Sequence, residues 1–240
     1  MQLATDTTKN LYPDLIEKGG LVKALQSALL EINSNLEAKE IGIEGFPVYA
    51  RLESEKRFSQ IYISSEQRMF IGDFWESGIM LGNVLTDSLA NLVEVLKLWL
   101  ETSIRLTELS KKFEFVKPDE KAEYFETGHE VEWQWKSLQI YIPQNFPELV
   151  PFLNEASNNS RLNKLFPFTS MNTFHFSRCT GYPFSRDCPV VMPLEGNKYK
   201  VFLPNREFIG EGNAKEAVEL IIQNLPPNTN SAIRGAKDDL

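Results

Sequence analysis

The spacing of hydrophobic residues changes in each half of the chain, from every second residue to every third or fourth. In the first half, Phe58 to Ile63 alternate as in a half-buried strand, and the same alternation occurs at Phe46, Val48, Ala50 and Leu52. A helical stripe follows at Leu89, Leu92, Val93 and Leu96. Short strands followed by an amphipathic helix are typical of an α+β fold, in which helices pack on antiparallel sheets. We therefore predict this fold class.

Other signals extend this pattern through the first half. Leu11 to Asp14 begin a helical turn that Gly19 and Gly20 end, and a helix is expected over about 20–33. Two short apolar stretches, Arg68 to Phe74 and Gly78 to Gly82, complete a meander of about four strands. The long helix is expected to begin at an N-cap, Thr86 or Asp87, and to reach about Leu109.

The second half has the same kinds of signal. Its expected strands are Val131–Trp135, Leu138–Ile142, Phe174–Arg178, Pro189–Leu194, Lys198–Leu203 and Arg206–Gly210. Pro143 and Pro147 are expected to start a helix that runs to about Glu155, and Arg161–Leu165 to form a helical turn. Asn213 with Glu216 resembles a capping box and predicts a final helix, which Pro226 and Pro227 end.

These elements divide the chain into an N-terminal half at 1–116 and a C-terminal half at 131–228. The charged stretch between them, 117–130, is interpreted as a linker or loop, although a solvated helix fits the same composition. The residues after 228 contain few apolar side chains, so 229–240 is expected to be a flexible tail.

Both halves end a strand in glycine, Gly82 or Gly210, before a capped helix. A duplicated β-meander-plus-helix unit and an ordinary α+β arrangement both explain this order.

Charge and hydropathy exclude two classes of partner. The formal charge is −8 and no run of Lys or Arg exceeds two residues, so nucleic acid is not expected as a partner. The longest apolar run, around Leu96 to Leu100, falls far short of the roughly 20 residues that cross a membrane. Met1 to Asn10 lack the layout of a signal peptide, so a cytoplasmic location is expected. The oligomeric state is left open.

Reactive side chains are densest between residues 175 and 189. A metal site there would use His175, Cys179 and Cys188, with Asp187 as a further ligand. This spacing matches no familiar zinc pattern, and the only other histidine is His129, so no metal is predicted. The chain also lacks a phosphate-binding loop, a dinucleotide fingerprint, a nucleophile elbow and an HExxH motif, so no cofactor is predicted.

The cysteines allow a catalytic hypothesis and a structural one. Cys179 or Cys188 could act as a nucleophile beside His175 or Arg186, because a nearby base or cation increases the thiolate fraction. In the structural alternative both are free, buried thiols, as expected in a reducing compartment, unless a hairpin brings them close enough for a disulfide. We favour the structural alternative, and whether the chain is an enzyme is left open.

Ligand binding is a further hypothesis for the same segment. Arg178 and Arg186 offer forked donors for a carboxylate or phosphate, while Tyr182 and Phe184 offer rings. Asp187 completes the predicted ligand-binding set. Solvated arginines in a structural loop explain the residues equally well. If the segment binds a ligand, we expect Trp75, Trp133 and Trp135 to extend an aromatic surface. If it is only structural, we expect them to pack into a core.

Several stretches of this chain resemble a bacterial family of unknown function. They are Arg161–Ser170, Phe176–Thr180 with Tyr182–Phe184 and Asp187–Pro189, Ile209–Glu211, Leu225–Pro227, and the N-terminal Leu11–Pro13 with Gly19–Leu21. The family is often labelled "natural product biosynthesis protein" and occurs near gene clusters for ribosomally made, modified peptides. The resemblance implies this genomic setting, and it implies no reaction and no catalytic residue.

From these observations we expect an accessory or binding protein of a modified-peptide pathway. Its partner would be a peptide, a biosynthetic enzyme or a small acidic ligand. The alternatives are an enzyme that uses a Cys/His site on a peptide or small molecule, and a purely structural protein that pairs through its sheet edges or aromatic surface.

Overall fold

A computed structural model describes residues 10–42 and 49–240 of the chain. It confirms the predicted α+β class, with helices packed on antiparallel sheets. The chain divides into two compact units, Met1–Glu123 (unit 1) and Tyr124–Leu240 (unit 2). Phe46 and Val48, which contributed to the predicted first strand, lie outside the described residues, as do the first nine residues. Within the described residues, no helix combines the length and hydropathy needed to span a bilayer.

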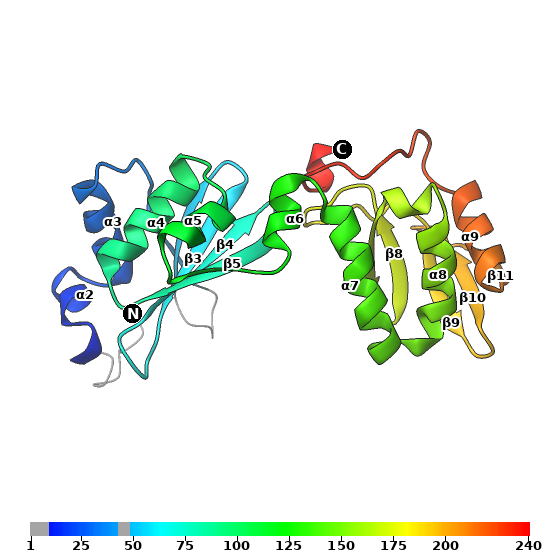
Figure 1. Cartoon of the computed structure of the whole chain (residues 1–240), viewed down its shortest axis with the longest axis horizontal. Coiled ribbons are helices and arrows are strands. Elements are labelled where there is room, and N and C mark those ends of the chain that lie inside the picture. Colours follow the sequence, from blue (N-terminus) through cyan, green and yellow to red (C-terminus); the bar gives the residue numbers. More distant parts are fainter. Residues whose placement is uncertain (1–9, 43–48) are drawn as a thin grey trace. The chain divides into compact units, whose positions relative to one another are not determined.

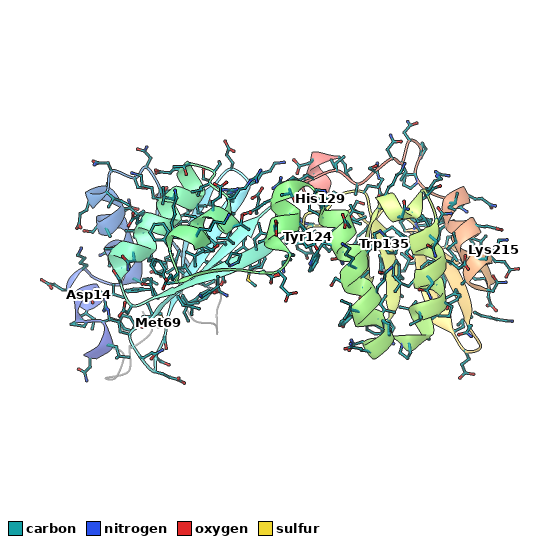
Figure 2. The ribbon with its side chains drawn as sticks, viewed as in Figure 1. Asp14, Met69, Tyr124, His129, Trp135 and Lys215 are labelled. Atoms are coloured by element: carbon teal, nitrogen blue, oxygen red, sulfur yellow. The ribbon has the colours of Figure 1, made fainter. Side chains whose placement is uncertain are left out.

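Unit 1 contains a sheet whose strands follow one another in chain order (Figure 1). Helices α2, at Pro13–Glu17, and α3, at Leu21–Glu31, precede the strands. The strands are β1 Lys39–Ile41, β2 Tyr49–Ser54, β3 Arg57–Ile63, β4 Phe70–Glu76, β5 Ile79–Thr86 and, after two helices, β6 Val116–Pro118. The two intervening helices are α4 Leu89–Glu101 and α5 Leu106–Lys112. Figure 2 labels Asp14 in α2 and Met69 before β4, at the place where the Tyr12 hydroxyl accepts a hydrogen bond from the Met69 N–H.

Unit 2 begins inside α6, Ala122–Thr127, and places α7 and α8 side by side (Figure 1). The helical elements before its sheet are α7 Glu130–Asn145, the 3₁₀ turn η1 Pro147–Leu149, α8 Val150–Asn158 and the 3₁₀ turn η2 Leu162–Lys164. The strands are β7 Phe166–Ser170, β8 Thr173–Ser177, β9 Val190–Leu194, β10 Lys198–Phe202 and β11 Phe208–Gly212. Helix α9, Ala214–Gln223, and the turn η3, Lys237–Asp239, follow.

Within the described residues, both units show one order of elements: helices, then five consecutive antiparallel strands, then a capped helix. The expected capping box is confirmed at α9, where the Asn213 and Glu216 side chains cap reciprocally. At α4 the N-cap is Ser88, rather than Thr86 or Asp87, and its side chain accepts from Asn91 N. Each half is thus a meander covered by helices, as predicted, and a duplicated origin stays a prediction.

The long helix expected to reach Leu109 is instead two helices, α4 and α5. Its end at Glu101 is stabilised from the sheet, because the Arg57 guanidinium donates to the carbonyl oxygens of Trp99 and Ile104 at 3.0 and 2.9 Å. Ser103 then has a positive φ of 54°, which interrupts helical geometry. Sequence spacing alone did not reveal this long-range cap.

The strands expected at Val131–Trp135 and Leu138–Ile142 are wrong, because both stretches lie in α7. Trp135, Leu138 and Ile142 are separated by three and four residues, and all three are buried on one helix face. The aromatic and β-branched content of these residues favoured strands in the sequence. Pro143 was also wrong as a helix start, since it lies in the last turn of α7.

The charged stretch 117–130 is folded rather than a plain linker. It contains the end of β6 and all of α6, and Phe125 packs edge-on against Trp133 and Phe166 with centroids 6.2 and 6.5 Å apart. The division between the units falls within it, between Glu123 and Tyr124. A helix in this stretch had remained an alternative in the sequence.

Residues 229–240, expected to be a flexible tail, form backbone hydrogen bonds with the stretch 178–183. Ile233 forms a parallel bridge with Cys179: its N–H donates to Arg178 O at 2.9 Å and its carbonyl accepts from Thr180 N at 3.0 Å. Farther along, Lys237 N donates to Pro183 O at 2.9 Å. Backbone pairing, which leaves little trace in composition, holds this polar segment on the unit.

Candidate functional site

The segment predicted from the sequence, residues 175–189, begins in β8 and continues as a loop wound around two serine hydroxyls. Ser177 Oγ donates to Cys179 O at 2.6 Å and accepts from the N–H groups of Cys179 and Ser185, each at 3.1 Å. Ser185 Oγ accepts from Arg178 N at 2.8 Å. Ser177 and Ser185 are both buried, so these bonds replace water for the loop backbone. The serines therefore give this loop its shape.

Neither cysteine is placed as an activated nucleophile. Cys179 is fully buried, lies 3.3 Å from Ser177 Oγ through its Sγ, and is bridged by the backbone of Ile233. Cys188 belongs to the hydrophobic core of unit 2, and burial, reinforced by Asp187, raises the pKa of its thiol to about 12. Both thiols are free. At neutral pH the Cys188 thiol therefore stays protonated, which disfavours nucleophilic attack.

His175 is oriented by groups other than the cysteines. Its ring stacks on Phe168 with centroids 4.8 Å apart, and its Nε2 lies 2.7 Å from Thr173 Oγ1. Burial, together with the nearby Arg186 charge, lowers the pKa of His175 to about 4. The ring is therefore neutral at physiological pH and packs as an aromatic side chain.

Two members of the predicted ligand-binding set pair with each other. The Arg178 guanidinium donates to Asp187 Oδ2 through Nε, at 2.8 Å, and through a second nitrogen. Burial tends to raise the pKa of Asp187, but hydrogen bonds from Arg178 and Ser185 outweigh it and lower the pKa. This ion pair joins the two ends of the loop. Arg178 and Asp187 thus have a structural use that the sequence could not show.

The remaining members are Tyr182, Phe184 and Arg186. Together with His175, the former catalytic candidate, they form a surface that we call the aromatic–arginine patch. Phe184 packs against Phe168 with centroids 4.8 Å apart and holds Tyr182 edge-on at 5.7 Å. The Tyr182 side chain is 57% exposed, and Arg186 is exposed as well. Within residues 10–42 and 49–240, Arg186 forms no ion pair. The patch therefore offers rings and a guanidinium to solvent.

No three His, Cys, Asp or Glu side chains of the described chain come together as a metal site would require. His129 is exposed at the start of α7, labelled in Figure 2, with its Nδ1 3.0 Å from Thr127 Oγ1.

The tryptophans have different surroundings. Trp135 donates to Leu165 O at 3.2 Å within the core, Trp133 packs on Phe125, and Trp75 stacks on Phe58 with centroids 5.4 Å apart.

Sequence reasoning missed Asp73 and Asn83, which stand opposite each other on β4 and β5 of unit 1. Asn83 Oδ1 is buried and has no hydrogen-bond partner in the part of the chain that the structure describes. Asp73 interrupts the apolar run from Phe70 to Trp75, and a carboxylate inside a strand of that kind was the available signal.

Comparison with known proteins gives one match. Residues 129–236 match the model of a family of unknown function (DUF6193). The match lies within unit 2, contains the 175–189 segment, and continues through the tail residues that pair with Cys179. The N-terminal stretch around Leu11–Pro13, which contributed to the resemblance, lies outside it. No curated protein and no solved structure matches the chain.

Proposed function

We propose that the chain is an accessory binding protein of the cytoplasm, that it serves a modified-peptide pathway, and that it holds an acidic peptide segment at the aromatic–arginine patch. The segment would belong to the peptide product or to a biosynthetic enzyme. The pathway part of the proposal rests on the resemblance at Arg161–Ser170 and Phe176–Pro189, and the ligand chemistry rests on the patch.

The observation that carries the proposal is the contrast between two arginines of one loop. Arg178 is tied to Asp187, whereas Arg186 is exposed, lies near enough to His175 to lower its pKa, and forms no ion pair within the described ranges. A guanidinium binds carboxylates in a bidentate manner, and exposed rings beside it add contact area at low cost in side-chain entropy. This combination suits an acidic group next to an apolar or aromatic one.

The surroundings of the Cys/His group favour binding over the enzyme alternative. A catalytic thiol needs an accessible, stabilised thiolate, whereas both cysteines are buried and Cys188 has a raised pKa. A general base must lie within hydrogen-bond reach of the group that it deprotonates. The Nε2 of His175, the expected base, is instead within reach of Thr173 Oγ1.

The test is a synthetic peptide array in which the number of Asp and Glu residues around one central aromatic residue is varied. We expect retention of the full-length protein to increase with the acidic count, and Arg186→Glu to reduce it at least tenfold. The control is Lys215→Glu, an exposed charge reversal on α9, labelled in Figure 2, which should keep binding within twofold. An equal loss in both variants, or no dependence on acidic residues, would contradict the proposal.

A further inference from the structure

The sheet of unit 1 has one face that none of the described helices covers. Helices α3 and α4 pack on the face that carries the buried Leu52, Ile61 and Phe74. The alternate residues of the same strands point to the other face. On that face the pairing register aligns a polar row across five strands: Arg51, Gln60, Asp73, Asn83 and Lys117.

Apolar and aromatic side chains flank this polar row on both sides. Tyr49, Tyr62, Ile71 and Leu85 lie along one side, and Phe58, Trp75 and Met80 along the other. Two of the ring pairs are in contact, Tyr49 with Tyr62 at 5.1 Å and Phe58 with Trp75 at 5.4 Å between centroids. A β-bulge between Phe74 and Trp75 lies next to the row, as bulges often do beside binding sites.

The outer members on the β2 side are already engaged. Arg51 Nε donates to Glu53 Oε2 at 2.9 Å, and its guanidinium lies 3.9 Å from the centre of the Phe58 ring. Gln60 uses both ends of its amide, since Oε1 accepts from the Tyr62 hydroxyl at 3.0 Å and Nε2 donates to the Tyr49 hydroxyl at 3.4 Å. This side of the row has few polar groups left for a ligand.

The centre of the row is different, because Asn83 has an acceptor without a partner among the described residues and Asp73 faces it from the neighbouring strand. Among the described residues, the buried Asn83 Oδ1 has no hydrogen-bond partner, and an unsatisfied buried acceptor destabilises a protein that has no ligand. Asp73 forms no ion pair with any residue in the described ranges. Lys117, at the end of the row, is exposed. It pairs with Asn83, so Asn83 lies between Lys117 and Asp73 in the row.

The surroundings of Asp73 disfavour its charged form, so a bound cation would stabilise the carboxylate. Burial raises the pKa of the Asp73 carboxyl, and the Trp75 indole offsets this only in part. The Trp75 Nε1–H is itself buried and is not within full hydrogen-bonding geometry of an acceptor in the described residues. Burial, and then the Asp73 charge, raise the pKa of Tyr62, which places the carboxylate near that ring as well.

We propose that this face of unit 1 binds the guanidinium of an arginine side chain in a partner peptide, with Asp73 and Asn83 as acceptors and the Trp75 ring as a stacking surface. The proposal concerns unit 1 alone and does not depend on the function proposed for unit 2. It assigns a ligand class to residues outside the matched range 129–236.

The shape and donor pattern of a guanidinium explain this choice. It is planar, carries five N–H donors and no acceptor, and stacks on aromatic rings. A carboxylate and an amide oxygen side by side can take several of these donors at once, while a neighbouring indole face covers the plane. A lysine ammonium would reach Asp73 but would not use the flat ring surface. An acidic ligand would meet the Asp73 carboxylate.

The test compares three probes, the tripeptide amides Ac-Gly-Arg-Gly-NH₂, Ac-Gly-Lys-Gly-NH₂ and the citrulline analogue of the first, by ¹H–¹⁵N NMR titration of the full-length chain. Citrulline keeps the shape of arginine without its charge. We expect the arginine peptide to bind at least tenfold more tightly than the citrulline peptide and more tightly than the lysine peptide, and to shift the Trp75 indole resonance, assigned with Trp75→Phe.

The decisive variant is Asp73→Asn, which should abolish the preference for arginine over citrulline. Its thermal midpoint should equal or exceed that of the wild type, because the change removes a poorly solvated charge. Glu211→Gln, an exposed strand carboxylate of unit 2, and Arg186→Glu should leave arginine binding within twofold. The proposal is overturned by equal binding of arginine and citrulline, by unchanged binding in Asp73→Asn, or by an equal loss in Glu211→Gln.

Discussion

The two units differ in how their polar side chains are satisfied, although both have the same order of elements. In unit 2, reactive side chains are densest in segment 175–189, and several of them bond within the segment itself. Ser177 organises the loop backbone, and Arg178 is paired with Asp187. In unit 1, Asp73 and Asn83 are inconspicuous in the sequence, yet among the described residues the buried Asn83 Oδ1 has no hydrogen-bond partner and Asp73 faces it across the strand pair. Residue types in the sequence therefore do not by themselves show which polar groups the fold leaves without a partner.

The glycine that precedes the capped helix in each unit also has a different local use. A Cβ at Gly82 would lie 2.4 Å from Lys117 O, so glycine there lets β6 approach β5. A Cβ at Gly210 would lie 2.7 Å from a Leu220 methyl group, so glycine there lets α9 pack on the sheet. The likeness between the units thus lies in the order of elements, and these two glycines serve separate contacts.

The largest effect is expected from core truncations, one in each unit. Phe74→Ala removes a ring that packs edge-on against Trp99 at 5.4 Å, and Phe152→Ala removes one that packs on Phe174 at 5.2 Å. Each should lower the free energy of unfolding of its own unit by about 3–5 kcal/mol. Hydrogen exchange measured by mass spectrometry should show faster exchange mainly within the mutated unit. Equal acceleration in both units would show that they unfold together and would remove the basis for comparing them separately.

A smaller effect concerns the pH dependence of unit 2. The folded pKa of His175, about 4, lies below its ordinary value of 6.5. As pH falls from 6.5 to 4, the unfolded chain binds a proton at His175 while the folded chain does not, so stability is lost over this window. The loss should be on the order of 1–2 kcal/mol after allowance for partial exposure.

His175→Phe preserves a ring against Phe168 and should remove that part of the pH dependence. The measurement is urea unfolding at half-unit intervals between pH 4 and 7. His129→Phe, at the exposed histidine, is the matched control and should retain the pH dependence of the wild type. If His175→Phe and the wild type lose stability in parallel, the assigned role of His175 is wrong.

The smallest effect tests the internal pairing of the 175–189 segment. A double-mutant cycle of Arg178→Ala and Asp187→Ala should give a coupling energy of about 1 kcal/mol, because the pair is part-exposed and therefore screened by solvent. A coupling near zero would mean that the two groups are free for a ligand, as the sequence first suggested, and the contrast with unit 1 would weaken.

The amino-acid sequence by itself determined the fold class and the elements whose signal is local. Spacing placed α3, the central strands of unit 1 and the strands β8 to β11, and the Asn213–Glu216 cap marked the start of α9, because these features depend on neighbours within a few residues. Spacing with a period of three and four also existed in α7, but its Val, Ile and Trp residues favoured strands.

Only the tertiary structure decided how the polar side chains are used. Arg57 ends α4 from a distant strand, Ile233 holds the tail against Cys179, and Asp187 takes the guanidinium of Arg178. Each of these pairings joins residues that local spacing does not connect, so hydrophobic periodicity carries no record of them. The physical reason is that a polar group must find a partner when the chain excludes water, and the fold determines which groups, such as Asn83, find none.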